Sequence, residues 1–128
     1  MEYLTAEQVL FIHARLIAET GGQHGVRDLD MLLSALGRVQ ASFDEKDLYP
    51  EVFSKAAALM DSLIRNHPFL DGNKRTGVTA AGIFLLRNGF RLIVNSDDLV
   101  EMTLRVARSQ TEVDELASWL ERYCEPFP

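Results

Sequence analysis

The feature that most constrains the fold of this chain is a pair of apolar segments separated by a nine-residue break. Residues 52–64 place apolar side chains at helical spacing, and residues 76–86 carry few polar side chains. The break reads His-Pro-Phe-Leu-Asp-Gly-Asn-Lys-Arg and covers residues 67–75. Because the residue before a proline is disfavoured in the helical region, the first helix should end before Pro68. The pattern predicts two packed helices joined by a loop, with the second starting near Asn73 and forming the buried helix of the domain.

The rest of the chain predicts further helices, each marked by a capping residue followed by apolar side chains at helical spacing. The expected N-caps are Thr5, Asp28, Ser96 and Thr111. Pro50 suits the first turn of the helix before the break. Residues 21–25 are expected to form a connecting turn, residues 41–49 a solvated loop and residues 90–94 an extended connector. We therefore expect an all-α fold, a single compact domain over residues 1–128 built as a bundle of about six helices.

Composition and charge narrow the classes of partner. No apolar run is as long as a membrane span, and the N-terminus lacks a basic signal-peptide start, so we expect a cytoplasmic protein with no membrane partner. A formal net charge of −6 argues against nucleic acid as a direct partner. The single cysteine, Cys124, excludes an internal disulfide and is expected to be an inert thiol. Arg65, Lys74 and Arg75 gather positive charge at the break, as a small anionic ligand requires.

Lys74 and Arg75 stand at the start of the predicted helix after the break. The free amides of a first helical turn and the positive end of the helix dipole both attract phosphate. Two cations at that end oppose the dipole and cost helix stability. We therefore expect a bound anion to compensate them, and we expect both side chains to bind phosphate.

The residues before these cations complete a set that can transfer a phosphate-containing group from a nucleotide to a hydroxyl. His67 supplies an imidazole, a side chain whose ordinary pKa of about 6.5 suits it to take a proton near neutral pH. Asp71 offers a hard oxygen ligand for Mg²⁺. Gly72 lets backbone amides approach an anion, and Asn73 can cap the helix or bind a phosphate. The alternative is a plain interhelical turn, for which the same residues are also well suited. His13 lies on the apolar stripe of the first helix and is expected to be a core histidine with one hydrogen-bond partner.

Residues 67–75 resemble the signature of the Fic/Doc family, His-Pro-Phe-x-Asp/Glu-Gly-Asn-Gly-Arg-x-x-Arg. The sequence departs from the adenylylating pattern twice, because Lys74 stands at the second glycine and Val78 at the final arginine. Both departures are similar to the death-on-curing (Doc) branch, which reads His-x-Phe-x-Asp/Asn-Ala/Gly-Asn-Lys-Arg. The resemblance extends to residues 37–41 and 84–89, so it covers most of the chain.

The resemblance implies a Fic-like helical bundle that serves as the toxin of a bacterial toxin–antitoxin system. Members of the Doc branch are ATP-dependent protein kinases that modify a translation factor, elongation factor Tu, at a hydroxyl group and so arrest translation. By this resemblance His67 would be the base, Asp71 would hold Mg²⁺, and residues 72–75 would bind the phosphates of ATP. Residues 41–49 would correspond to the flap with which the family aligns its target segment, by strand addition. The resemblance also implies a cognate, Phd-like antitoxin whose disordered tail folds on binding.

Two alternatives to a kinase stay open at this point. Fic relatives transfer AMP, and their pattern has a small residue at position 74 and an arginine at position 78 to hold the outer phosphates. Lys74 and Val78 fit a nucleotide turned end for end, with its γ-phosphate toward His67, and so favour phosphorylation. The second alternative is a non-enzymatic helical module that uses the basic loop to bind phosphate or an acidic partner.

Overall fold

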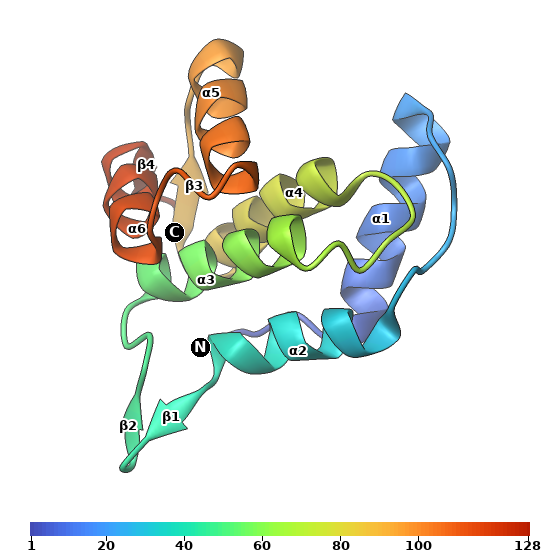
Figure 1. The fold of residues 1–128 in the computed structure, drawn as a ribbon. Helices are drawn as coiled ribbons and strands as arrows, with labels where there is room; N and C mark the ends of the chain where they lie inside the picture. The colour runs from blue at the N-terminus through green and yellow to red at the C-terminus, as the bar shows by residue number, and fades with distance from the viewer.

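The computed structural model describes all residues from Met1 to Pro128. Six helices make up the domain: α1 (Ala6–Thr20), α2 (Leu29–Val39), α3 (Val52–Arg65), α4 (Asn73–Arg87), α5 (Ser96–Ala107) and α6 (Val113–Arg122) (Figure 1). Two small antiparallel pairs accompany them: β1 (Ser42–Phe43) with β2 (Lys46–Asp47), and β3 (Phe90–Leu92) with β4 (Cys124–Pro126). The predicted all-α bundle of six helices is confirmed. None of the helices combines the length and the hydropathy that crossing a membrane requires.

The centre of the bundle is α3, which packs against α2, α4, α5 and α6. Eleven of its fourteen residues are buried, whereas six of the fifteen residues of α4 are buried. The more buried of the two helices is therefore α3, and not α4 as the sequence suggested. The apolar composition of α4 misled the prediction because its outer face is left partly open, with Leu86 43% exposed.

Gly77 lets α4 lie close against α3. A Cβ atom at this position would lie 2.8 Å from Cγ1 of Ile64 and 3.3 Å from the carbonyl oxygen of Met60. Both distances are shorter than ordinary van der Waals contacts. The absence of a side chain at Gly77 therefore allows the start of α4 to pack closely against α3. The loop before α4 is held near the centre of the bundle in the same way.

The N-terminal helices begin where the capping signals predicted. Thr5 forms a capping box at the start of α1, and the Asp28 side chain caps α2. Pro50, by contrast, lies outside α3, because Glu51 is the N-cap of that helix. Pro50 therefore lies two residues before the first residue of α3 and not in its first turn, as was predicted.

The two C-terminal caps were each predicted one residue away from their true position. Asn95, not Ser96, caps α5, because its side chain accepts a hydrogen bond from the N–H of Asp98 at 2.8 Å. Glu112, not Thr111, is the N-cap of α6 and makes no side-chain cap hydrogen bond. Both Asn and Ser are good capping residues, so propensity alone could not choose between neighbours.

Residues 41–49 are more ordered than the solvated loop that was predicted. They contain the β1–β2 hairpin, whose tip residues Asp44 and Glu45 have φ values of 53° and 64°. Positive φ at both tip residues is the hallmark of a two-residue type I′ turn. Lys55, on α3, is buried and holds the hairpin base through its Nζ, 3.3 Å from Oδ2 of Asp47 and 3.3 Å from the carbonyl oxygen of Val39.

The hairpin lies at the N-terminal end of α3 and projects away from the helices, whereas the loop of residues 66–72 lies at the other end of α3 (Figure 1). Fourteen helical residues span roughly 20 Å. In this conformation the hairpin lies at the opposite end of α3 from the loop, and its role as a flap that aligns a target segment stays a prediction.

The extended connector predicted at residues 90–94 contains β3, which pairs with β4 at the C-terminus. Phe90 faces Pro126, and Leu92 faces Cys124. Burial raises the pKa of the Cys124 thiol to about 11. The thiol therefore stays protonated near neutral pH, in agreement with the inert cysteine that the sequence predicted.

Candidate active site

The loop between α3 and α4 is held by a second segment that lies beside it. Residues 25–28 run antiparallel to residues 68–70, with a bridge between Val26 and Phe69. The amide of Arg27 donates to the carbonyl of Pro68 at 2.8 Å, and the amide of Leu70 donates to the carbonyl of Gly25 at 3.1 Å. The loop thus has a paired backbone over part of its length, which gives its side chains defined positions.

His13 anchors the loop from beneath. Its ring stacks on the buried Phe69 ring with the centroids 3.8 Å apart, and its Nε2 lies 2.8 Å from the carbonyl oxygen of Asp71. The side chain is 4% exposed and has no other hydrogen-bond partner. The prediction of a core histidine with one partner is confirmed, so His13 positions the loop and is not open to a substrate.

His67 is exposed at the edge of the loop and holds a left-handed backbone conformation, with φ of 51°. Non-glycine residues seldom adopt this region, and such conformations cluster at functional sites. Arg27 supports it, because Nε donates to the carbonyl of His67 at 2.6 Å and Nη2 donates to the carbonyl of Asn66 at 2.8 Å. The ring nitrogen Nδ1 lies 3.5 Å from Nδ2 of Asn73, which leaves Nε2 open to approach from solvent.

Asn73 ties the first residue of α4 back to the loop. Its Oδ1 accepts from the amide of Phe69 at 2.9 Å, and its Nδ2 donates to the carbonyl of Phe69 at 3.0 Å. Both functions of the carboxamide are therefore used by the loop backbone. At an anion site Asn73 would contribute its backbone N–H, whereas its side chain keeps the loop closed.

Gly72 starts α4 as an N-cap in the left-handed conformation, with φ of 78°. A Cβ atom here would lie 3.0 Å from Cδ1 of Ile17, so both the conformation and the space favour glycine. The first hydrogen bond of the helix runs from the amide of Thr76 to the carbonyl of Gly72. The amides of the three preceding residues, Asn73, Lys74 and Arg75, have no acceptor within the chain.

Lys74 is the one side chain of the loop and first turn that is a free cation. It is exposed and forms no ion pair or hydrogen bond. Together with the three free amides it makes a positively charged helix start, which is the arrangement that binds phosphate. His67, whose Nδ1 lies 3.5 Å from Nδ2 of Asn73, therefore lies beside this positively charged helix start.

Arg75 is used differently from Lys74. Its Nη1 donates to Oγ1 of Thr20 and, at 2.8 Å, to the carbonyl of Gly21, so it closes the end of α1 onto α4. Its Nη2 lies 3.9 Å from Oδ1 of Asp71. The guanidinium still adds positive charge to the site, but its forked donors are largely committed.

Asp71 is ionised and partly exposed. Its Oδ2 accepts from the amide of Gln23 at 3.0 Å, and its Oδ1 accepts from the amide of Gly72 at 2.8 Å. These two hydrogen bonds, the one from Gln23 first, hold the pKa of the carboxyl below its ordinary value. The side chain is 47% exposed, so each oxygen keeps lone pairs that a hard cation can use.

A Mg²⁺ ion fits the chemistry of this carboxylate. No group of three or more His, Cys, Asp and Glu side chains in the chain is arranged as a metal cage. Mg²⁺ commonly takes one or two protein carboxylates and completes its octahedron with substrate phosphates and water. Asp71 beside a phosphate-binding helix start would supply the protein's share of such a site.

The sequence predicted the residues of the loop but not the segment that supports them. Arg27 and Gln23 are 40 and 48 residues away from their partners His67 and Asp71. The glycines at positions 21, 22 and 25 were a usable signal, since glycine permits close backbone approach. At Gly22 a Cβ atom would lie 2.6 Å from Oδ2 of Asp71. Gly22 and Gln23, within the turn that was expected to be a connector, thus form part of the wall of the site.

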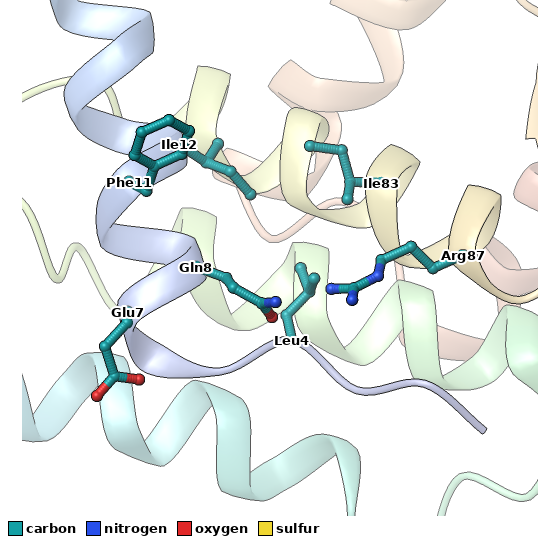
Figure 2. A pocket seen from close by; sticks show the side chains of 7 residues that line it. All are labelled: Leu4, Glu7, Gln8, Phe11, Ile12, Ile83 and Arg87. Carbon is teal, nitrogen blue, oxygen red and sulfur yellow. The ribbon is translucent and has the colours of Figure 1, made fainter.

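Two of the hollows along α4 also adjoin α1. One lies between α1 and the C-terminal half of α4, has a volume of about 360 Å³, and is lined by residues that include Leu4, Phe11, Ile83 and Arg87 (Figure 2). The other, of about 400 Å³, lies between the end of α1, the start of α4, and α5. Lys74 and Arg75 line the second hollow, so this one adjoins the positively charged start of α4.

Comparison with known proteins agrees with the motif. Residues 3–85 match the model of the Fic/DOC family. Toxin Doc from Mycolicibacterium smegmatis is 44% identical over 121 residues, which cover 93% of this chain and 91% of that protein. Protein kinase doc from Escherichia phage P1 is 30% identical over 122 residues, which cover 95% of each chain. The chain belongs to the Fic/DOC family, as the resemblance of residues 67–75 predicted.

Proposed function

We propose that this protein is the toxin of a toxin–antitoxin system and acts as an ATP-dependent kinase on a Ser or Thr hydroxyl of a translation factor, elongation factor Tu. The observation that carries the proposal is the exposed imidazole of His67 beside three unpaired amides and the free cation Lys74. The names of the two relatives, a toxin and a protein kinase, support the same activity.

In this proposal each residue of the loop has one task. His67 takes the proton of the target hydroxyl through its open Nε2 while that oxygen attacks the γ-phosphorus. A new O–P bond forms, the bond from the γ-phosphorus to the bridging oxygen breaks, and ADP leaves. The unpaired amides of Asn73 and Arg75, with Lys74, stabilise the charge on the phosphate oxygens during transfer. Mg²⁺, when bound at Asp71, neutralises further phosphate charge.

Phosphoryl rather than adenylyl transfer is supported by the side chains at positions 74 and 78. An adenylylating site would hold the outer phosphates of ATP in the space where Val78 faces the hollow between α1, α4 and α5. Val78 can neither donate a hydrogen bond nor neutralise a phosphate, and Lys74 takes up room at the entrance. A nucleotide with its γ-phosphate toward His67 avoids both conflicts.

The proposed partners are the target protein and a cognate, Phd-like antitoxin whose disordered tail folds on the toxin. The net charge of −6 favours a protein that does not bind DNA on its own. Binding of the purified chain to DNA with the steep salt dependence of phosphate contacts would contradict this part of the proposal.

The test is expression of the chain in bacteria without an antitoxin, with growth as the readout. The native chain should stop growth, and His67→Ala should restore it. His24→Ala is the matched control, because His24 is also exposed, lies in the neighbouring segment and makes no hydrogen bond; this variant should remain toxic.

The chemical step is then read by incubating the purified chain with ATP, Mg²⁺ and elongation factor Tu and measuring the mass added to the target. A gain of one phosphoryl group is expected. A gain of one AMP would replace the kinase by an adenylyltransferase. Binding of nucleotide without any modification of the target, together with toxicity that persists in folded His67→Ala, would indicate the non-enzymatic binding module instead.

A further inference from the structure

We propose that the hollow between α1, α4 and α5 holds the base and ribose of the nucleotide, and that it accepts both purine bases. This inference rests on the proposed function, since it assumes that the triphosphate lies on the start of α4. The hollow has a volume of about 400 Å³, within the range of about 300–1,000 Å³ that is usual for small-molecule sites. Five of its ten lining residues are aliphatic, with Leu16, Val78, Leu99 and Leu104 among them.

The position of the hollow relative to His67 sets the orientation of a bound nucleotide. Successive residues of an α-helix are about 100° apart around the axis, so Val78 and Arg75 lie roughly 140° and 160° away from Asn73. The side chain of Asn73 faces the loop and His67, whereas Val78 and Arg75 line the hollow. A triphosphate that crosses the start of α4 from His67 therefore ends at the hollow on the opposite side of the helix.

The cations and the distance both favour this hollow over the one between α1 and the far half of α4. Lys74 and Arg75 stand where the triphosphate would enter it. Val78 is five residues from the start of α4, about 7 Å along the axis, whereas Ile83 is ten residues away, about 15 Å. The hollow at Ile83 (Figure 2) has no cation on its side toward the loop, because its Arg87 lies farther along α4.

The hydrogen-bonding groups of the hollow explain why it should accept either purine. All of its lining residues belong to helices, whose backbone groups are largely paired. The hydroxyls of Thr20 and Thr103 already donate to the carbonyls of Leu16 and Leu99, both at 2.6 Å, and the Thr20 hydroxyl also accepts from Arg75. The Thr79 hydroxyl makes no hydrogen bond and can donate or accept, so Thr79 and Thr103 both offer an acceptor. Adenine and guanine can each donate an N–H to such an acceptor. The hollow therefore selects a base by size and not by the pattern of its polar edge.

The test is isothermal titration calorimetry of the purified chain with ATP and Mg²⁺, and in parallel with inorganic tripolyphosphate, which has no base. Val78→Phe fills the hollow from one wall without removing a charge. It should weaken ATP binding by about tenfold or more, because the base loses its apolar contact surface. The affinity for tripolyphosphate should stay the same. Ile83→Phe is the matched control on the same helix, and it should change neither affinity.

Each outcome separates this inference from the proposed function. If wild type and Val78→Phe bind ATP equally well, and circular dichroism shows both folded, the base lies elsewhere and only this inference fails. If wild type binds neither ATP nor tripolyphosphate, both this inference and the proposed function fail. ATP and GTP should bind to wild type with affinities within a few-fold of each other. A hundredfold preference for one purine would overturn the assignment, since a threonine hydroxyl that can donate or accept suits the polar edge of either purine.

Discussion

Replacing Asn73 by alanine should loosen the loop while leaving the overall fold in place. Asn73 makes two hydrogen bonds to the backbone of Phe69, at 2.9 Å and 3.0 Å, and Phe69 is 1% exposed. A typical hydrogen bond contributes about 1 kcal/mol, and a buried group left without a partner costs about 1–3 kcal/mol. Loss of both bonds should therefore lower the free energy of unfolding by about 2–3 kcal/mol.

Thermal unfolding and urea denaturation measure this change directly. For a domain of this size a loss of about 2 kcal/mol lowers Tm by roughly 6–10 °C. The same loss moves the urea midpoint down by about 1 M. Lys74→Ala is the control at the adjacent position, because that side chain is exposed and unbonded; its stability should stay within about 0.5 kcal/mol of wild type.

The same pair of variants separates the two roles within the loop. Lys74→Ala should weaken binding of tripolyphosphate, since it removes the free cation of the helix start. An Asn73→Ala protein with the Tm and urea midpoint of wild type would refute the reasoning. In that case the carboxamide would not be holding the loop, and its side chain would be available to a phosphate.

Two further predictions concern packing and pH. Gly77→Ala should lower the free energy of unfolding by about 1 kcal/mol or more, because its Cβ would lie 2.8 Å from Cγ1 of Ile64. Gly82→Ala, on the open face of the same helix, should raise the free energy of unfolding by up to about 1 kcal/mol. Equal urea midpoints for the two variants would contradict this. The raised pKa of Cys124 favours the protonated thiol in the folded state, so the stability it contributes is complete below about pH 9 and is lost as the pH rises to about 11. Over that window the stability of the native chain should fall more steeply than that of Cys124→Ser in urea titrations, and parallel pH curves would exclude a role for the thiol.

The sequence by itself determined the helices and the family. Helical spacing and capping residues are local properties, so six helices were predictable, with errors of one residue at Ser96 and Thr111. The identities of residues 67–75 were also sufficient to predict the Fic/DOC family. They predict a phosphate-binding loop as well. These inferences depend only on residues that are neighbours in the chain.

The tertiary structure decided which of the two helices α3 and α4 is the more buried and how the loop residues divide their work. Apolar composition could not distinguish α3 from α4, because burial depends on how many helices pack around each one. The sequence also could not show that Asn73 is hydrogen-bonded to Phe69, and Arg75 to Thr20 and Gly21. Lys74, by contrast, makes no such bond. The segment at Gln23 and Arg27 reaches the loop only when the chain folds back over 40 residues or more. Contacts between residues so far apart depend on packing, and packing leaves no periodic signal in a single sequence.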